Sequence, residues 1–371
     1  MSRAGVICEF NPFHNGHKFL LEKIKKEYAD EIICIMSGNF VQRGDIAITD
    51  KYARTLCALQ NGADIVVELP TPYALSSARI FAENSVRLAA AMNCDKLCFG
   101  AESGLEELIE LSDLLNDTAV NEKIQSYMKD GMYYPKALSL SVGENYETII
   151  SQPNNILALE YIRACKAYDI EPIAIERKGV GHDEESFSGN YASASLIRKM
   201  IFDGGDYAQF TPMIVETPCC LDRIEAAVLY RLRTIQPDEL RKIADVSEGL
   251  ENRIVQVAKQ YNSIEEILEA VKTKRYTMAR LRRIFFATLL HITAQIQNTP
   301  VPYLRILGLH SGKESLVSGA KLPLIIKTKA DYEKLDNSAK EIFNVDIHAS
   351  EAMNIASNQN INEFSQPIIK V

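Results

Sequence analysis

The first hundred residues alternate short apolar runs with helical segments, and this alternation limits the fold more than any other feature of the chain. The runs are residues 4–10, 31–38, 63–70 and 95–102. Each is nearly continuous in hydrophobic residues, which indicates strands buried on both faces. Strands of this kind separated by helices form a parallel sheet with helices on both sides. We therefore predict an α/β fold with a Rossmann-like parallel sheet.

The rest of the chain is predicted to be mostly helical. One more strand is expected at 171–179 and a helix at 193–204. Beyond residue 210 the apolar spacing is helical, with little strand signal before residue 322. A length of 371 residues suits two domains, at about 100–200 residues each. We expect a sheet domain over 1–210 and a mainly helical domain over 211–371.

The composition is that of an ordinary soluble protein, with 47% hydrophobic and 24% charged residues. A net charge of −8 argues against a chain coated by nucleic acid, although it permits a local basic patch. The eight cysteines show no spacing typical of a zinc site, and we expect no bound metal and reduced thiols. We expect neither a signal peptide nor a membrane span, and hence a cytoplasmic protein. No pattern indicates an oligomeric state.

The strongest motif is F-N-P-F-H-N-G-H at 10–17, between the first predicted strand and the first predicted helix. His14 and His17 are three residues apart and share a helix face. Backbone N–H groups and the helix dipole favour an anion there, and Gly16 permits close approach of a nucleotide. The imidazoles are suited to bind the α-phosphate of ATP and to stabilise charge during its attack by an acid. The alternative is a pair of capping or core histidines.

A second motif is S-A-S-L-I-R at 193–198. Ser193 and Ser195 can donate to phosphate oxygens, and Arg198 can neutralise the leaving pyrophosphate. The alternative is an N-cap serine followed by a surface arginine. The residues alone therefore indicate an enzyme that adenylylates an acid or a phosphate group.

The two motifs are similar to the His-x-Gly-His and Ile-Ser-Ser-Thr-x-x-Arg signatures of nucleotidyltransferases, although Ala192 and Ala194 depart from the second. More specifically, VICEFNPFHNGH, MSGNFVQRGD, KYARTLCALQNGADIVVELP and QPNNILALEY resemble the tRNA(Met) cytidine acetate ligase family of bacteria. The resemblance covers most of residues 4–200.

This resemblance implies a reaction. ATP and acetate would give acetyl-adenylate and pyrophosphate, and the acetyl group would pass to N4 of the wobble cytidine in elongator tRNA(Met). Acetyl-CoA would not be the donor. Mg²⁺ is expected to accompany the ATP phosphates. The domain at 1–210 would then bind ATP and form the adenylate.

The site expected from the motifs and the resemblance has His14, His17 and Arg198 as catalytic residues. Of Asn154 and Asn155, either could supply an amide to the ligand. Gly100 is expected either to bind ATP or to be a turn glycine. Arg177 is expected either to bind ATP or to be a solvated charge. The expected ATP-binding residues are Ile7, Cys8, Glu9, Phe10, Asn11, Pro12, Phe13, His14, Asn15, Gly16, His17, Lys18, Phe19, Leu20, Gly100, Asn154, Asn155, Arg177, Ser193 and Ser195.

Two polar loops have open roles. In the loop at 36–45, Gln42, Arg43 and Asp45 could contact substrate or RNA, or could form a solvated turn. His182, in a glycine-rich loop, is either a lid residue or simply an exposed histidine.

Residues 270–313 contain no Asp or Glu, in a chain that is acidic overall. Basic residues beside Tyr276 on a predicted helix suit a phosphate backbone and stacked bases. The alternative is a helix face that packs on acidic neighbours in the first domain. The expected tRNA-binding residues are Lys272, Lys274, Arg275, Arg280, Arg282 and Arg283.

Two other functions compete with the ligase. A small-molecule adenylyltransferase that makes a coenzyme precursor would use the histidine motif but leave the acid-free segment without a role. An RNA-binding module with a degenerate nucleotide site is the non-enzymatic possibility, and the intact His14 and His17 argue against it.

Overall fold

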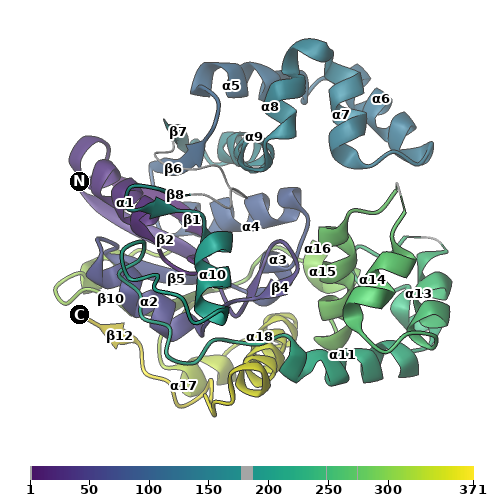
Figure 1. Cartoon of the computed structure of the whole chain (residues 1–371). Helices are drawn as coiled ribbons and strands as arrows, with labels where there is room; N and C mark the ends of the chain where they lie inside the picture. The colour runs from purple at the N-terminus through teal and green to yellow at the C-terminus, as the bar shows by residue number, and fades with distance from the viewer. Residues whose placement is uncertain (1, 177–186, 248, 274) are drawn as a thin grey trace.

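The protein is described here by a computed structural model covering residues 2–176, 187–247, 249–273 and 275–371 (Figure 1). Its centre is an eight-stranded sheet with the order β11-β10-β5-β2-β1-β6-β7, and β12 pairs with β10. The strands of this sheet are β1 (Arg3–Cys8), β2 (Glu31–Ser37), β5 (Ile65–Leu69), β6 (Lys96–Ala101), β7 (Glu171–Glu176), β10 (Leu304–Leu309), β11 (Leu324–Ile325) and β12 (Ile369–Lys370).

The predicted parallel sheet is confirmed. The four apolar runs of the first hundred residues form β1, β2, β5 and β6, and the run at 171–179 begins as β7. These five strands pair in parallel with one another. Every residue of β2 and β5 is buried, as expected for strands covered on both faces.

The helices lie on both faces of the sheet. On one face, Leu21 of α1 and Leu59 of α2 pack with Val6 and Cys34. On the other face, α4, α9 and α18 pack against Ile33 and its neighbours. The helices of these layers are α1 (Asn15–Glu27), α2 (Lys51–Gln60), α3 (Thr71–Ala74), α4 (Ala78–Ala91), α9 (Pro153–Lys166), α10 (Ala194–Phe202), α17 (Thr328–Glu333) and α18 (Asn337–Ser357).

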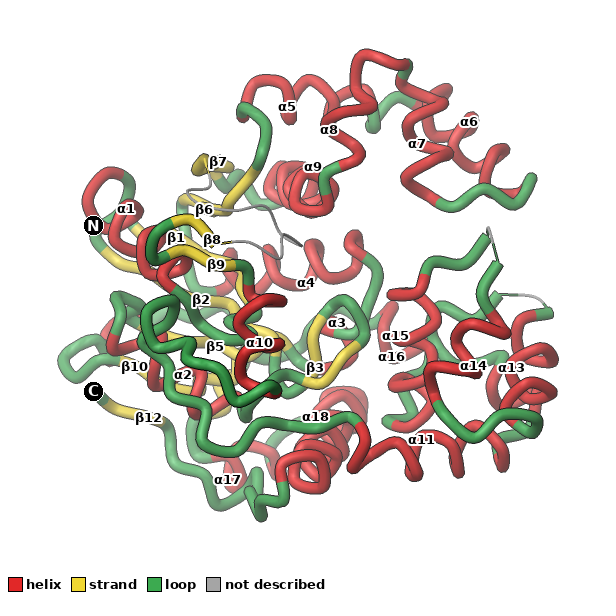
Figure 2. Tube along the Cα trace, in the orientation of Figure 1, coloured by secondary structure: helices red, strands yellow, loops and turns green. Residues whose placement is uncertain are grey.

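Two helical parts project from the sheet layers, and Figure 2 shows both as helices joined by loops. An arm between β6 and α9 contains α5 (Leu105–Leu114), α6 (Thr118–Lys129), α7 (Tyr134–Val142) and α8 (Glu147–Ser151). A lobe with its own apolar core contains α11 (Asp222–Thr234), α12 (Pro237–Leu240), α13 (Leu250–Ala258), α14 (Ile264–Val271), α15 (Met278–Leu289) and α16 (Ala294–Asn298). Residues of α18 belong to both the lobe core and the sheet core.

The C-terminal half also supplies strands to the sheet, which the sequence reading did not anticipate. β10 lies before residue 322, in the region that showed little strand signal, and pairs antiparallel with β5. The reason is that LRILGL at 304–309 is a short apolar run outside the strand–helix alternation of the first hundred residues, and without that context periodicity cannot assign it to a strand or to a buried helix. The boundary at 210/211 stays a prediction, and segments from both sides of it share one sheet.

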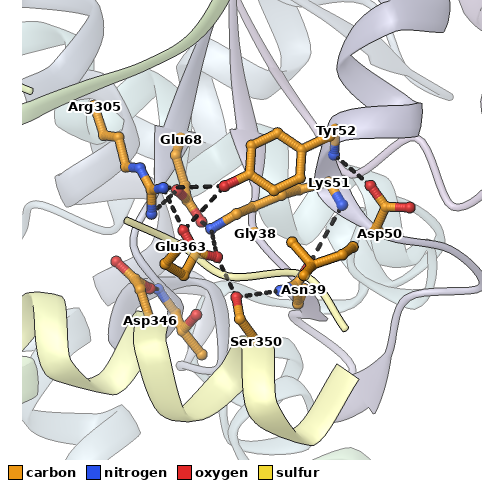
Figure 3. Close-up of polar contacts among 12 residues, drawn as sticks. Gly38, Asn39, Asp50, Lys51, Tyr52, Glu68, Arg305, Asp346, Ser350 and Glu363 are labelled. Carbon is orange, nitrogen blue, oxygen red and sulfur yellow. Dashed lines mark hydrogen bonds and ion pairs between the residues drawn. The ribbon is translucent and has the colours of Figure 1, made fainter. Parts of the chain in front are cut away.

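A buried cluster of charges joins the two halves of the chain (Figure 3). Lys51 Nζ lies 2.7 Å from Glu68 Oε1 and 2.8 Å from Glu363 Oε1. Arg305 Nη1 lies 3.1 Å from Glu68 Oε2, and Arg305 also pairs with Glu363. No side chain of the four is more than 3% exposed. Burial alone raises the pKa of Glu363, but Lys51 and Arg305 hold that pKa well below its usual range.

We expect Glu363→Gln to reduce the free energy of unfolding by about 3–5 kcal/mol, the range for removing one partner from a buried ion pair. The reason is that Lys51 and Arg305 would share a single carboxylate, Glu68. Equilibrium unfolding in urea measures the change. The matched control is Glu314→Gln, which removes a carboxylate from a half-exposed pair with Lys370 and should leave the urea midpoint unchanged. Equal midpoints for both variants would contradict this role of the cluster.

Candidate active site

His14 and His17 form the N-terminal cap of the first helix, and each holds the other's ring in place. His14 is the N-cap of α1, and its Nδ1 accepts from Gly16 N at 3.1 Å. His17 Nδ1 accepts from His14 N at 3.2 Å, so the two rings form a reciprocal capping box. A ring nitrogen that accepts a hydrogen bond carries no proton. In the neutral rings the proton is therefore on Nε2, and each histidine presents one N–H donor.

The two imidazole rings are held by stacking. Their centroids are 3.7 Å apart with an interplanar angle of 19°. The buried rings of Phe10 and Phe13 lie 5.0 Å and 5.6 Å from the His17 ring. A Cβ on Gly16 would lie 2.9 Å from His14 Cε1, so any larger residue here would displace the capping ring. The capping alternative is thus realised, and it uses Nδ1 of each ring.

A cavity of about 370 Å³ lies beside these histidines, at the carboxyl ends of β1, β6 and β7. Its size falls in the range of about 300–1,000 Å³ that is typical of small-ligand pockets. The expected site residues that line it are Ile7, Cys8, Glu9, Phe10, Asn11, His14, Gly16, His17, Phe19, Leu20, Gly100, Asn154 and Arg198.

Several expected residues do not line the cavity: Pro12, Phe13, Asn15, Lys18, Asn155, Ser193 and Ser195. Asn155 is buried and accepts from the backbone N–H groups of Glu102 at 3.1 Å and Ser103 at 3.3 Å. Of the two asparagines, Asn154 therefore faces the cavity and Asn155 holds the loop after β6.

The second motif forms the start of α10. Ser193 is its N-cap and accepts from Leu196 N at 3.1 Å, which is the structural alternative considered for this serine. Arg198 donates from Nη1 to the carbonyl oxygen of Asn11 at 2.8 Å and from Nη2 to Ser195 Oγ at 3.4 Å. Arg198 is thereby fixed against the segment that precedes the histidines. Arg177, His182 and Lys274 lie outside the described residues.

Motif reading missed the apolar and aromatic part of the cavity wall, because these residues carry no pattern of their own. Only their position at strand ends and on inward helix faces could have indicated them. They are Val6, Val41, Phe81, Phe99, Leu157, Tyr161, Ile175 and Tyr191. The charged Glu176, at the end of β7, also lines the cavity and was not expected, as do Ala192 and Ala194 at the second motif.

The loop at 36–45 is a hairpin that brings the helical lobe to the cavity. Strands β3 (Phe40–Val41) and β4 (Asp45–Ile46) pair antiparallel. Gly44 has φ +77°, and a Cβ there would lie 2.6 Å from Arg283 N in α15. Through this close contact Gln42, Arg43, Asp45 and Arg282 all line the cavity. Arg282 was expected to serve tRNA alone.

Two carboxylates in the cavity are surrounded by arginines. Burial raises the pKa of Glu9, and a hydrogen bond from Gln42 N at 2.7 Å opposes this rise. Burial also raises the pKa of Asp45, while Arg198 and Arg282 lower it. The cavity wall therefore carries both negative and positive side chains.

The other basic residues of 270–313 have varied surroundings. Arg280 donates to the Asp245 carbonyl oxygen at 2.7 Å, and Arg283 Nη2 lies 2.9 Å from Asp245 Oδ2. These two arginines hold the lobe together. Lys272 and Arg275 are exposed, and Arg275 lies 5.9 Å from the Tyr276 ring. A tRNA contact at any of these positions stays a prediction.

Comparison with known proteins gives consistent matches over the whole chain. The family model described as HIGH Nucleotidyl Transferase matches residues 1–366. The chain is 38% identical over 405 residues to the tRNA(Met) cytidine acetate ligase of Thermoanaerobacter sp. (strain X514), with 100% of both covered. It is 36% identical to that of Clostridium perfringens (strain ATCC 13124), covering 100% of this chain and 97% of the relative.

Solved structures are similar as well. The apo crystal structure of Thermotoga maritima TmcAL superposes with a TM-score of 0.91 at 28% identity, covering 100% of both chains. The structure of the same protein bound with alpha-thio ATP gives a TM-score of 0.89 at 27% identity, covering 100% of this chain and 99% of that one.

We expect Gly16→Ala to weaken ATP binding at least about tenfold, or about 1.4 kcal/mol, because the new Cβ would displace the His14 ring. Isothermal titration with ATP measures the affinity. The matched control is Gly104→Ala, where a Cβ would meet no atom within 4 Å. Unchanged affinity in Gly16→Ala would show that the placement of the His14 ring is not needed for binding.

Proposed function

We propose how this chain works from the premise that it belongs to the HIGH nucleotidyltransferase family and, within it, to the tRNA(Met) cytidine acetate ligases. It is an ATP-dependent ligase that acts in two steps. ATP and acetate first give acetyl-adenylate and pyrophosphate. The acetyl group then passes to N4 of the wobble cytidine in elongator tRNA(Met).

The observation that carries the proposal is the pair of capped histidines on the cavity wall. Their backbone hydrogen bonds leave Nε2–H as the one donor of each neutral ring, at the positive end of a helix. When acetate attacks the α-phosphate, negative charge grows on its non-bridging oxygens. Donors that are already oriented stabilise this charge without reorganising, which lowers the barrier.

Arg198 is proposed to act on the leaving group. It lies on the cavity wall and is fixed to the Asn11 carbonyl oxygen, so its guanidinium is oriented before ATP binds. Pyrophosphate carries several negative charges as it departs, and a planar cation with several donors suits it. Gly100 and Asn154, on the same wall, would lie against the nucleotide.

Mg²⁺ is proposed to enter with ATP. Within the described ranges, no group of three or more His, Cys, Asp and Glu side chains could hold a metal ion. The phosphate oxygens and water would therefore supply most of its ligands, as is usual for Mg²⁺ on nucleotides. Free acetate, and not acetyl-CoA, is the proposed acyl source.

The helical lobe is proposed to hold the tRNA. It carries the exposed Lys272 and Arg275 beside Tyr276, and through Arg282 it reaches the cavity. An acceptor held on the lobe would thus meet the adenylate where the hairpin contacts α15. In the described part of the chain, the helices are too short or too polar to cross a bilayer. A cytoplasmic location remains part of the proposal.

Labelled acetate with ATP should label elongator tRNA(Met), and labelled acetyl-CoA without ATP should not. In His14→Ala and in His17→Ala, acetate-dependent pyrophosphate exchange should fall by roughly 10²-fold or more, the scale for losing one transition-state donor. The control is His348→Ala, at an exposed histidine of α18. Labelling by acetyl-CoA alone, or exchange at the wild-type rate in both variants, would refute the proposed chemistry.

The double variant Lys272→Ala, Arg275→Ala should weaken tRNA binding and flatten its dependence on salt. Each lost phosphate contact should reduce the logarithmic slope by about one. Arg280 and Arg283 are left intact because both contact Asp245 inside the lobe. Filter binding over a range of salt concentrations measures the slope, with the exposed Lys334→Ala as control. An unchanged slope would remove this surface from the tRNA site.

A further inference from the structure

Glu9 lies on the cavity wall between the histidine motif and the hairpin at 36–45. It directly follows β1 and precedes the histidine motif, and its side chain lines the cavity. Glu9 Oε1 accepts from Gln42 N of the hairpin at 2.7 Å. Within the described part of the chain, Glu9 Oε2 accepts no hydrogen bond. One carboxylate oxygen is therefore anchored, and the other is left for a ligand.

Charged and titratable groups face Glu9 from every element around it. Arg43 comes from the hairpin, Arg198 from α10, and Arg54 from α2. Tyr161 of α9 and Cys8 of β1 lie close enough for Glu9 to raise their pKa values further. Burial raises the pKa of Glu9 while the arginines oppose this rise. A carboxylate in such surroundings is a stronger base than an exposed one.

The position of Glu9 relates to both proposed substrates. On one side lie His14 and His17, where the α-phosphate is proposed to bind. On the other side lies the hairpin, which packs on α15 and brings Arg282 of the lobe to the same cavity. An acyl group attached to the α-phosphate and an acceptor entering from the lobe would meet between these two sides.

We propose that Glu9 is the general base of the acetyl-transfer step. This inference rests on the proposed function. The lone pair of cytidine N4 is delocalised into the pyrimidine ring, so the amine gains nucleophilicity only as it loses a proton. Glu9 Oε2 accepts that proton while N4 bonds to the acetyl carbonyl carbon. The bond from this carbon to the phosphate oxygen breaks, AMP leaves with the electron pair, and Glu9 later releases the proton to water.

Asp45 is the other carboxylate in the hairpin part of the cavity, and it is less suited to this step. Its Oδ1 accepts from the N–H of the next residue, Ile46, at 2.9 Å. It is also influenced by Arg198 and by Arg282, the residue that marks the acceptor side. Asp45 therefore counters the charge of these arginines, whereas Glu9 lies next to the histidine motif.

Glu9→Gln tests the proposal, because the amide oxygen can still accept from Gln42 N while the side chain loses its basicity. Three activities are compared in the full-length protein: acetate-dependent ATP–pyrophosphate exchange, formation of acetohydroxamate from added hydroxylamine, and acetylation of tRNA. Hydroxylamine is nucleophilic without a base. We expect the loss of tRNA acetylation to exceed the loss of either of the first two activities by about 10²- to 10⁴-fold.

Glu9→Asp and Glu22→Gln complete the set. Glu9→Asp keeps a carboxylate and should acetylate tRNA at least about tenfold faster than Glu9→Gln. Glu22→Gln removes an exposed carboxylate of α1 and controls for net charge. A melting curve for each variant identifies losses caused by unfolding, and any such loss would also reduce pyrophosphate exchange.

The results that would overturn the role of Glu9 differ from the result that would refute the proposed function. Equal losses in all three activities of Glu9→Gln would assign Glu9 to binding of ATP or acetate, and a raised Mg²⁺ requirement for exchange would make it a metal ligand. Normal tRNA acetylation would show that no base is needed at this position. Each of these results overturns the inference. Absence of acetate-dependent acetohydroxamate in the wild-type protein would instead refute the proposed function itself.

Discussion

The loops of the cavity depend on one buried guanidinium, that of Arg54 in α2. Its Nη1 donates to the carbonyl oxygens of Glu9 at 2.7 Å and Ser37 at 3.0 Å, its Nε donates to Thr49 at 3.1 Å, and its Nη2 donates to Gly38. The carbonyls of Glu9, Ser37 and Gly38 lie where the chain leaves two neighbouring strands of the sheet, β1 and β2, and that of Thr49 lies just before α2. A single side chain therefore fixes where the histidine motif and the hairpin begin. Because its five N–H groups form a rigid fork, arginine is the side chain suited to this position.

The same helix joins the N-terminal sheet to the C-terminal half. Three residues before Arg54, Lys51 enters the buried cluster with Glu68, Arg305 and Glu363. Burial and then the nearby Glu68 raise the pKa of Asp346, at the edge of this cluster, to about 7. Ion pairs of this kind add little net stability over apolar packing, yet they strongly penalise any arrangement in which one partner is missing. The cluster thus specifies which C-terminal segments lie against the sheet.

The sequence predicts those parts of the fold whose signals are local. Continuous apolar runs identified the five parallel strands, and the spacing of His14 and His17 identified a helix start at a strand end. The tertiary features were not predictable in this way. β10 lies outside the strand–helix alternation that identified the other strands, and periodicity alone cannot assign it. The contact of Gly44 with α15 joins residues more than two hundred positions apart. Arg282 and Arg283 are adjacent in sequence, and only the fold shows that their surroundings differ. Arg282 lies on the cavity wall, whereas Arg283 pairs with Asp245.

The antiparallel β10 has a consequence for how the protein is made. Until residues 304–309 have left the ribosome, β5 has no neighbour on one side, and its buried apolar residues form an open edge. Glu68, inside that strand, also lacks Arg305 until then. The half that carries the histidine motif is translated first, but it cannot complete its sheet during most of synthesis. For most of its synthesis, the nascent chain therefore exposes an unpaired strand edge that can pair with other chains and aggregate. Chaperones protect proteins in such states.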